Sequence, residues 1–201
     1  MIGIIDYGLG NIQSFLNCFR ILDVPAIPVK NKIDLQKIDR AILPGVGAFD
    51  SAIQRLNDFD LVQDLEDLVL NQSLPILGVC VGLQIMARSS EEGLKKGLAW
   101  LDADVKIINK KEKLPLPHMG WNEIDIKGNN SKLLLNLDSP RFYFLHSYYL
   151  SMDKNSDQIA TTNYGGFLTA AVQKNNIYGC QFHPEKSHSS GLKVLENFSK
   201  L

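Results

Sequence analysis

Short apolar segments alternate with helical segments through the first half of the chain. The apolar segments have the length of strands and cover residues 2–6, 25–29, 40–43 and 75–79. Between and after them, residues 11–22, 61–70 and about 82–88 place apolar side chains at helical spacing. This alternation predicts βαβ units around a mostly parallel sheet with helices on both faces, which is a three-layer, flavodoxin-like α/β fold.

The second half of the chain is richer in strands than the first. Its candidate strands are residues 104–109, 122–127, 141–150, 166–173 and 177–183. An amphipathic helix closes the chain, with Leu192, Leu195 and Phe198 on one side. We expect an antiparallel extension of the sheet. Because 201 residues with 45% hydrophobic content suit one core, residues 1–201 are predicted to form a single domain.

Charge and cysteine content exclude several classes of partner. The formal net charge is -1, which favours neither nucleic acid nor an anionic membrane surface. The chain has no apolar run near the roughly 20 residues that span a bilayer. Its three cysteines are far apart, lack C-x-x-C spacing and follow no secretory signal. We therefore expect reduced thiols in the cytoplasm, with no metal and no cofactor.

Cys80 stands between two glycines where an apolar strand is predicted to meet a helix. The sequence Gly78-Val79-Cys80-Val81-Gly82 has the pattern of a nucleophile elbow, in which small neighbours permit a sharp turn. The start of a helix favours thiolate over thiol, and the amide of Val81 would face a developing oxyanion. Burial as an inert thiol is the alternative for Cys80, and it is the preferred interpretation of Cys18 and Cys180.

A thiolate nucleophile needs a base, and His183 is the best candidate. It lies at the end of a predicted strand, and Glu185 follows two residues later, where extended backbone would turn both side chains the same way. Glu185 could therefore orient His183, as the third member of a triad does. His118, His146 and His188 are weaker candidates, and we expect a local hydrogen bond for His146 and exposure for His188.

Two glycine-rich stretches follow strands in the first half. Pro44-Gly45-Val46-Gly47 would meet the Cys80 turn at the carboxyl edge of the sheet, so its amides could supply a second oxyanion donor. Gly8-x-Gly10 suggests a dinucleotide site, but Gln13 replaces the third glycine of that motif. The second strand also ends at Lys30 instead of an acidic residue. A tight turn is the preferred interpretation of residues 8–10.

The combined motifs resemble those of class I (triad) glutamine amidotransferases. The blocks that carry this resemblance are GVCVGLQ, PGVG, HSYY and QFHPEKS. A further set of blocks resembles a narrower group, the glutaminase subunits of imidazole glycerol phosphate synthases. These blocks are DYGLGN, PGVGAF, SSEEG, PHMGWN, FYFLHSYY and HPEKS. These blocks run from Asp6 to Ser187 and so cover nearly the whole chain.

The resemblance implies a role for individual residues. Cys80 matches the nucleophile, His183 the general acid and base, and Glu185 the residue that orients it. The positions that match the oxyanion hole are Val46, Gly47 and Val81. The positions that match glutamine binding are Gly47, Gln84, Ser147 and Tyr148. The positions that match the subunit interface or the ammonia exit are Asn11, Met119, Trp121, Tyr143 and Lys186.

The resemblance also implies a reaction and a partner. Glutamine would be hydrolysed through a cysteinyl thioester, and the ammonia would pass to a synthase (cyclase) subunit, a (β/α)8 barrel, within a heterodimer of the histidine pathway. A paralogous subunit that feeds a sugar amidotransferase of surface-polysaccharide biosynthesis has nearly the same motifs. A stand-alone γ-glutamyl cysteine hydrolase and a silent binding subunit are the remaining alternatives.

Overall fold

An eight-stranded sheet forms the centre of the molecule and combines both halves of the chain. The computed structural model describes residues 1–109, 114–128, 131–138 and 140–201. The strands lie in the order β2-β1-β3-β4-β12-β11-β10-β7. Their bounds are β1 (Ile2–Ile5), β2 (Ala26–Val29), β3 (Arg40–Gly45), β4 (Ile76–Cys80), β7 (Asp125–Ile126), β10 (Gln158–Asn163), β11 (Phe167–Lys174) and β12 (Ile177–Cys180). The first five strands in this order, β2, β1, β3, β4 and β12, are parallel to one another. Strands β11, β10 and β7 each pair antiparallel with the strand before them, as predicted.

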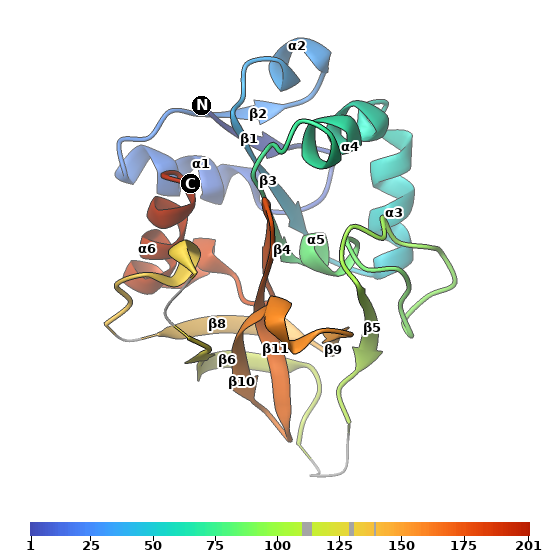
Figure 1. The fold of residues 1–201 in the computed structure, drawn as a ribbon, viewed down its shortest axis with the longest axis vertical. Coiled ribbons are helices and arrows are strands. Elements are labelled where there is room, and N and C mark those ends of the chain that lie inside the picture. Colours follow the sequence, from blue (N-terminus) through green and yellow to red (C-terminus); the bar gives the residue numbers. More distant parts are fainter. Residues whose placement is uncertain (110–113, 129–130, 139) are drawn as a thin grey trace.

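Helices cover both faces of this sheet, which confirms the three-layer prediction. The α-helices are α1 (Ile12–Ile21), α2 (Lys32–Leu35), α3 (Phe49–Asp58), α4 (Val62–Leu70), α5 (Val81–Gln84) and α6 (His188–Phe198). Helices α1 and α6 lie on one face, and α3, α4 and α5 lie on the other (Figure 1). Strands β1 and β4 are buried along their whole length, as their continuous apolar runs require between two helical layers.

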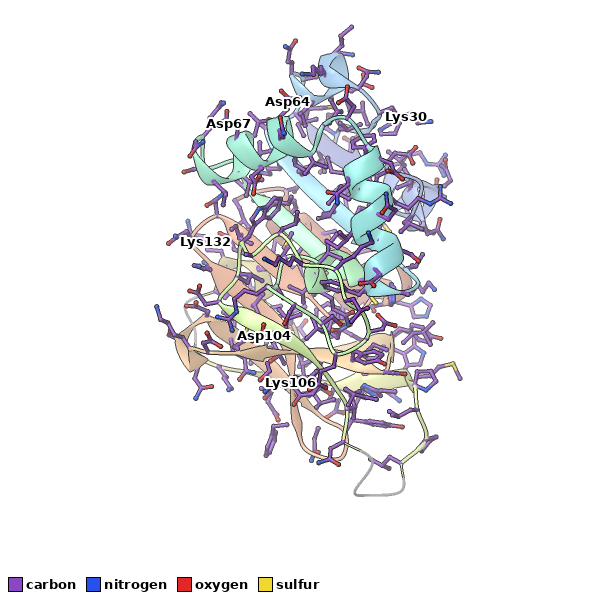
Figure 2. The ribbon with its side chains drawn as sticks, turned by 90° about the vertical axis from the view of Figure 1, so that its right-hand side faces the viewer. Lys30, Asp64, Asp67, Asp104, Lys106 and Lys132 are labelled. Atoms are coloured by element: carbon purple, nitrogen blue, oxygen red, sulfur yellow. The ribbon has the colours of Figure 1, made fainter. Side chains whose placement is uncertain are left out.

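The helix α4 shows how the apolar periodicity places one element. Leu65 and Val69 are buried towards the sheet, because they recur at helical spacing. Asp64 and Asp67 lie on the outer surface of the molecule (Figure 2). The same division explains α6, whose buried side chains include Leu195 and Phe198, as predicted for the closing helix.

Several predicted boundaries in the chain are wrong. The helix expected up to about Arg88 ends at Gln84, because the following carbonyl groups instead accept hydrogen bonds from residues 97–101. The strand expected over 141–150 is two strands in two separate ribbons. These ribbons pair β6 (His118–Glu123) with β8 (Arg141–His146), and β5 (Ala103–Ile107) with β9 (Tyr148–Met152). The strand expected over 122–127 is likewise divided between β6 and β7.

The parallel part of the sheet brings three chain segments to one edge. Strands β3 and β4 end side by side, with Gly45 paired to Cys80 in the register. Strand β12 runs parallel to β4 on its other side, and its chain continues towards His183. It ends at Cys180, three residues earlier than predicted, and a 3-10 helix, η4 (Pro184–Lys186), follows. The two other 3-10 helices of the described residues are η2 (Lys132–Leu134) and η3 (Asn155–Asp157).

Candidate active site

Cys80 lies at the turn between β4 and α5, where the sequence predicts a nucleophile elbow. Its backbone has φ 55° and ψ -113°, a left-handed conformation that a non-glycine residue keeps only under the constraint of its surroundings. The two glycines have the expected purpose of letting the chain bend without clashes, although the positive φ falls on Cys80 itself. A Cβ at Gly82 would lie 1.9 Å from the carbonyl oxygen of Leu43, and one at Gly78 would lie 2.7 Å from the Cα of Leu83. The glycines therefore permit close backbone packing.

The loop after β3 lies directly against this turn. A Cβ at Gly45 would be only 2.2 Å from the amide nitrogen of Gly82. Val46 and Gly47, which has φ +87°, continue the loop and line the same pocket as Cys80 and Val81. The structure thus brings together the segments that the sequence predicts to supply both oxyanion donors.

Residues 8–10 form the tight turn that was preferred over a nucleotide site. Gly8 and Gly10 have positive φ angles of 87° and 92°. A Cβ at Gly10 would meet the Cβ of Pro44 at 2.6 Å, and the neighbouring Tyr7 hydroxyl donates a 2.7 Å hydrogen bond to the Pro44 carbonyl. This turn therefore packs against the base of the loop that contains Val46.

His183 and Glu185 form a buried pair beside Cys80. The Nδ1 atom of His183 lies 2.8 Å from Oε1 of Glu185, and both side chains are only 3% exposed. The two side chains meet through the 3-10 turn that starts at Pro184, and not through the extended strand that the sequence suggested. Ser187 stabilises this turn, because its hydroxyl donates a 2.6 Å hydrogen bond to the His183 carbonyl.

The surroundings of His183 favour its protonated form. Burial alone would lower the pKa of this imidazole, but hydrogen bonds and charge interactions with Cys80 and Glu185 more than offset it and raise the pKa to about 10. An imidazolium at neutral pH is able to donate a proton to a leaving group. The pair therefore has the electrostatics that a general acid beside a nucleophilic sulfur requires.

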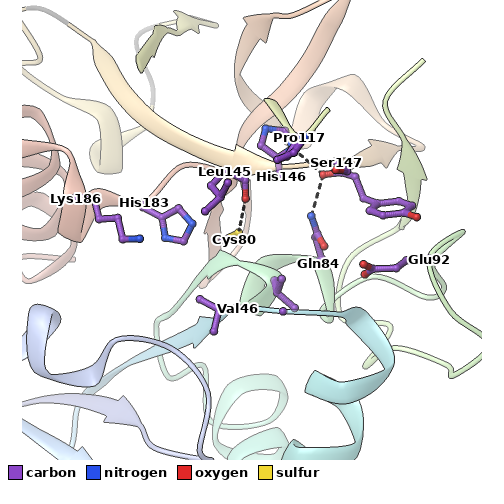
Figure 3. A pocket seen from close by; sticks show the side chains of 13 residues that line it. Val46, Cys80, Gln84, Glu92, Pro117, Leu145, His146, Ser147, His183 and Lys186 are labelled. Atoms are coloured by element: carbon purple, nitrogen blue, oxygen red, sulfur yellow. Dashed lines mark hydrogen bonds between the residues drawn. The ribbon is translucent and has the colours of Figure 1, made fainter. Parts of the chain in front are cut away.

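A pocket of about 290 Å³ opens above Cys80 and is lined by all four of the predicted substrate-binding residues (Figure 3). Gln84, Ser147 and Tyr148 line it, together with Gly47. The Gln84 Nε2 atom donates hydrogen bonds to the Tyr148 carbonyl at 2.9 Å and to Oε1 of Gln181 at 3.1 Å. Both amide protons of Gln84 are therefore used, so its carbonyl oxygen is the group left for a ligand.

Glu92 also lines the pocket, and the sequence did not assign it a function. It lies opposite Gln84 with its carboxylate directed towards the cavity (Figure 3). One carboxylate oxygen accepts a 2.8 Å hydrogen bond from the Phe49 amide at the start of α3. The motif SSEEG contains Glu92, but nothing in the sequence indicates which of its two glutamates faces Cys80.

Four of the five predicted interface residues form a cluster next to the pocket, in which Met119, Trp121 and Lys186 are exposed and Tyr143 is half-buried. Met119 and Trp121 are 66% and 40% exposed, respectively. The Trp121 ring is edge-on to Tyr143 at a centroid distance of 6.2 Å, and Lys186 Nζ lies 5.6 Å from the centre of the Tyr143 ring. Asn11, the fifth residue, caps α1, which packs against η4.

The remaining histidines have structural surroundings. His146 Nδ1 lies 2.8 Å from the Tyr148 carbonyl, which confirms the expected local hydrogen bond. Its Nε2 lies 3.1 Å from Nδ1 of the buried His118, whose ring stacks between Phe144 and Tyr164. His188 is exposed, as expected. Burial lowers the pKa of His118 to about 4 and that of His146 to about 3, so both are neutral at pH 7.

These two neutral histidines predict a loss of stability in mild acid. The unfolded chain binds their protons near pH 6.5 and the folded chain does not, so stability falls as the pH drops from about 7 to 5, by about 2 kcal/mol for each. His183 acts in the opposite direction, because its raised pKa gives a stabilisation that is complete below about pH 6.5 and is lost as the pH rises through about 10. Urea unfolding at pH 7 and 5 should show the loss.

The comparison that tests this assignment uses two histidine variants. In His146→Gln the difference in stability between pH 7 and pH 5 should shrink by about 2 kcal/mol. His118→Gln, which removes the other buried histidine, should shrink the difference by a similar amount. An unchanged difference in His146→Gln would contradict the assignment.

The described residues contain no group of three or more metal-ligating side chains that could hold an ion. Within the same part of the chain, no helix has the length and apolar character needed to cross a membrane.

Known proteins share both the sequence and the fold of this chain. The family model for class-I glutamine amidotransferases matches residues 3–201. A protein of Leptospira interrogans, "Imidazole glycerol phosphate synthase subunit HisH", is 48% identical over 205 residues, with 100% of both chains covered. A protein of the same name from Bdellovibrio bacteriovorus is 43% identical, again over 100% of both chains. A crystal structure of a glutamine amidotransferase has a TM-score of 0.74 at 18% identity, with 100% of this chain and 99% of the other covered.

Proposed function

Because this chain belongs to the class-I glutamine amidotransferases, we propose that it is the glutaminase subunit of an imidazole glycerol phosphate synthase. It would hydrolyse glutamine and pass the ammonia to a cyclase subunit in histidine biosynthesis. The observation that carries the proposal is the strained Cys80 turn with the buried His183–Glu185 pair at one pocket. We take residues 1–201 as one domain that acts in the cytoplasm as half of a heterodimer.

The first half of the reaction releases ammonia. The Cys80 sulfur attacks the side-chain amide carbon of glutamine, and the amides of Val81 and of the Val46–Gly47 loop stabilise the resulting oxyanion. His183 then donates its proton to the amide nitrogen, the C–N bond breaks and ammonia leaves. A γ-glutamyl thioester remains on the sulfur. Glu185 would hold the imidazole ring in position and stabilise its charged form.

The second half of the reaction frees the enzyme. His183, now neutral, takes a proton from water, and the hydroxyl oxygen attacks the thioester carbon. The C–S bond breaks, the electron pair returns to the Cys80 sulfur and glutamate leaves. His183 is again protonated and Cys80 is again a thiolate, so one glutamine and one water give one glutamate, one ammonia and the proton that the new carboxyl group releases.

Substrate recognition would use the polar groups around the pocket. Free glutamine carries an ammonium and a carboxylate, so its site needs groups of both kinds. Glu92 is the acidic side chain that faces the cavity, and we propose that it binds the substrate ammonium. Gln84, Ser147 and Tyr148 would hold the rest of the substrate in the orientation that presents its amide to Cys80.

Neutralising Glu92 should weaken glutamine binding without removing the chemistry. In Glu92→Gln the KM for glutamine should rise about 10- to 100-fold, because a charge-assisted hydrogen bond is lost, while kcat changes by less than about threefold. The amide oxygen can still accept the bond from Phe49, so α3 keeps its capping partner. Steady-state kinetics of the assembled enzyme measure both constants.

Glu91→Gln provides the matched control for this prediction. The neighbouring Glu91 accepts a hydrogen bond from the Ile107 amide and does not line the pocket. Its variant should have the KM of the original chain. A Glu92→Gln enzyme with the same KM as this control would remove Glu92 from the binding site.

The partner subunit would cover the cluster beside the pocket. Met119, Trp121, Tyr143 and Lys186 present apolar and cationic surface there, and aromatic residues are enriched at the centre of protein interfaces. Ammonia released at Cys80 would then leave towards the partner and not into bulk water. The barrel fold of that partner and the passage of ammonia to it are part of the proposal.

The test combines the purified chain with a cyclase subunit encoded in the same genome. Glutamate formation by the chain alone should be slow, and addition of the cyclase with its substrate should raise the rate by orders of magnitude and give product. If only a sugar amidotransferase from a polysaccharide pathway activates the chain, the paralogous function is correct. Efficient cleavage of γ-glutamyl peptides by the chain alone would instead identify a stand-alone hydrolase.

A further inference from the structure

Gln181 is a polar side chain with no exposed surface that reaches the reacting sulfur. It follows the last strand of the parallel sheet, two residues before His183, and its Nε2 atom lies 3.7 Å from Cys80 Sγ. We propose that Gln181 is a catalytic residue that donates a hydrogen bond to the Cys80 thiolate. This inference rests on the proposed function only in taking Cys80 as the nucleophile.

The orientation of the Gln181 amide follows from its neighbours. A backbone carbonyl can only accept, so Gln84 must direct its NH₂ group at the Tyr148 oxygen, 2.9 Å away. The same Gln84 nitrogen lies 3.1 Å from Gln181, which must therefore present its oxygen there. The Gln181 NH₂ group is then left facing Cys80. The opposite orientation would place two donors against each other at 3.1 Å.

The Tyr148 carbonyl that fixes this orientation also accepts a hydrogen bond from a second direction, at the end of a chain of side chains that begins with Asn122. Asn122 must donate to the Asn163 carbonyl at 3.0 Å, so the same NH₂ group also faces Nε2 of His118 at 3.3 Å. Both buried imidazoles are neutral, so His118 donates through Nδ1 to His146, which donates through its own Nδ1 to Tyr148. Every donor and acceptor along this path is matched, and the result agrees with the orientation derived from Gln84.

The sulfur needs a donor on this side when it is ionised. As a thiol, Cys80 can donate to the Leu145 carbonyl, 3.9 Å from Sγ. As a thiolate it has no proton to donate, and the carbonyl then presents the negative end of its dipole to the negative sulfur. The Gln181 NH₂ group supplies a donor that offsets this repulsion. This donor is present whether His183 is protonated or neutral.

A hydrogen-bond donor to the sulfur would act both when the thioester forms and when it breaks down. It stabilises the attacking thiolate, and it stabilises the same thiolate when it leaves the thioester carbon. When the thioester breaks down, water has already given its proton to His183. The electron pair released from the C–S bond then returns to a sulfur that both His183 and Gln181 contact. Removal of the Gln181 donor should therefore slow the breakdown of the thioester as well as its formation.

The test measures how alkylation of Cys80 depends on pH. The full-length chain is treated with iodoacetamide between pH 5 and 10, and mass spectrometry follows the modification at Cys80. In Gln181→Met, which keeps the length of the side chain but has no donor, the midpoint of the profile should rise by about 1 pH unit. In Gln181→Glu, which presents an acceptor, it should rise by about 2 pH units or more.

Apart from the carboxyl group that Gln181→Glu adds, the titratable groups around the sulfur are the same in all variants: His183, Glu185, Lys186, His146, Tyr7, Cys180 and Glu92. The matched control is Gln158→Met in β10, which also removes a glutamine NH₂ donor, in that case to the Thr169 hydroxyl at 2.7 Å. Its midpoint should equal that of the original chain. A Gln181→Met chain that folds and keeps the original midpoint would overturn the proposal.

A second measurement uses no change at Gln181. Side-chain amide NMR signals of the original chain and of Cys80→Ala are compared at pH 7.5. The Gln181 amide proton that is hydrogen-bonded to the sulfur should move upfield once the sulfur is removed. An unmoved signal would contradict the contact. Neither measurement needs glutamine turnover or a partner, so a chain without glutaminase activity would refute the proposed function and leave the Gln181 contact still testable.

Discussion

Cys80→Ala is expected to abolish glutamine-dependent synthesis by the assembled enzyme and to leave ammonia-dependent synthesis at its original rate. The thioester cannot form without the sulfur, so hydrolysis should fall by about 10⁴-fold or more, to the background of the assay. Ammonium salts bypass Cys80 and supply the cyclase directly. Product formation with glutamine and with ammonium chloride, measured on the same preparation, gives both rates.

Cys18→Ala is the matched control for this result. Cys18 is a free thiol like Cys80, but it is buried in α1 and does not line the pocket. Its variant should keep both activities. Loss of both activities in a Cys80→Ala enzyme that still assembles with its partner would contradict the proposed division of labour between the subunits.

Gly45→Ala should damage both the stability and the chemistry of the protein. The new Cβ would lie 2.2 Å from the Gly82 nitrogen and 2.7 Å from the Val81 carbonyl carbon, and neither backbone atom can move freely. We expect the free energy of unfolding to fall by about 3 kcal/mol, and kcat to fall about 100- to 1,000-fold as the oxyanion donors on the two sides separate. Urea unfolding and steady-state kinetics measure the two effects.

A glycine with open surroundings separates this clash from a general effect of alanine. Gly128 has φ +68°, but among the described residues, its chain neighbours aside, no atom lies within 4 Å of the Cβ that alanine would add. Gly128→Ala should therefore lose only about 1 kcal/mol of stability through backbone strain and keep full activity. Equal effects of the two substitutions would contradict the packing argument at Gly45.

The parallel half of the fold was predictable because its sequence pattern is local. β1, β4 and the part of β3 after Arg40 are continuous apolar runs, and buried parallel strands require that pattern. The second half was harder, because one run of strand-forming residues supplies β8 and β9. The chain changes from one ribbon to the other at Ser147, and the cause lies in pairing with β6 and β5, which are distant in sequence.

The site was predictable where a residue type is rare and its chemistry narrow. Cys80 and His183 stand out in this way, since few side chains serve as a nucleophile or a base near neutral pH. Glu92 and Gln181 did not stand out, because glutamate and glutamine are common and their roles depend on neighbours from other elements. Gln181 is recognisable only once its contacts with Gln84 and Cys80 are known.

The close packing around Cys80 limits which parts of this protein can change over evolutionary time. Gly45, Gly78 and Gly82 admit no larger side chain, and the strained Cys80 turn depends on them. Met119 and Trp121 are exposed and are under no such packing restriction. We expect substitutions to accumulate at the surface while the turn stays fixed. A descendant of this chain could therefore change its partner, and with it the pathway that receives its ammonia, without redesigning the hydrolysis.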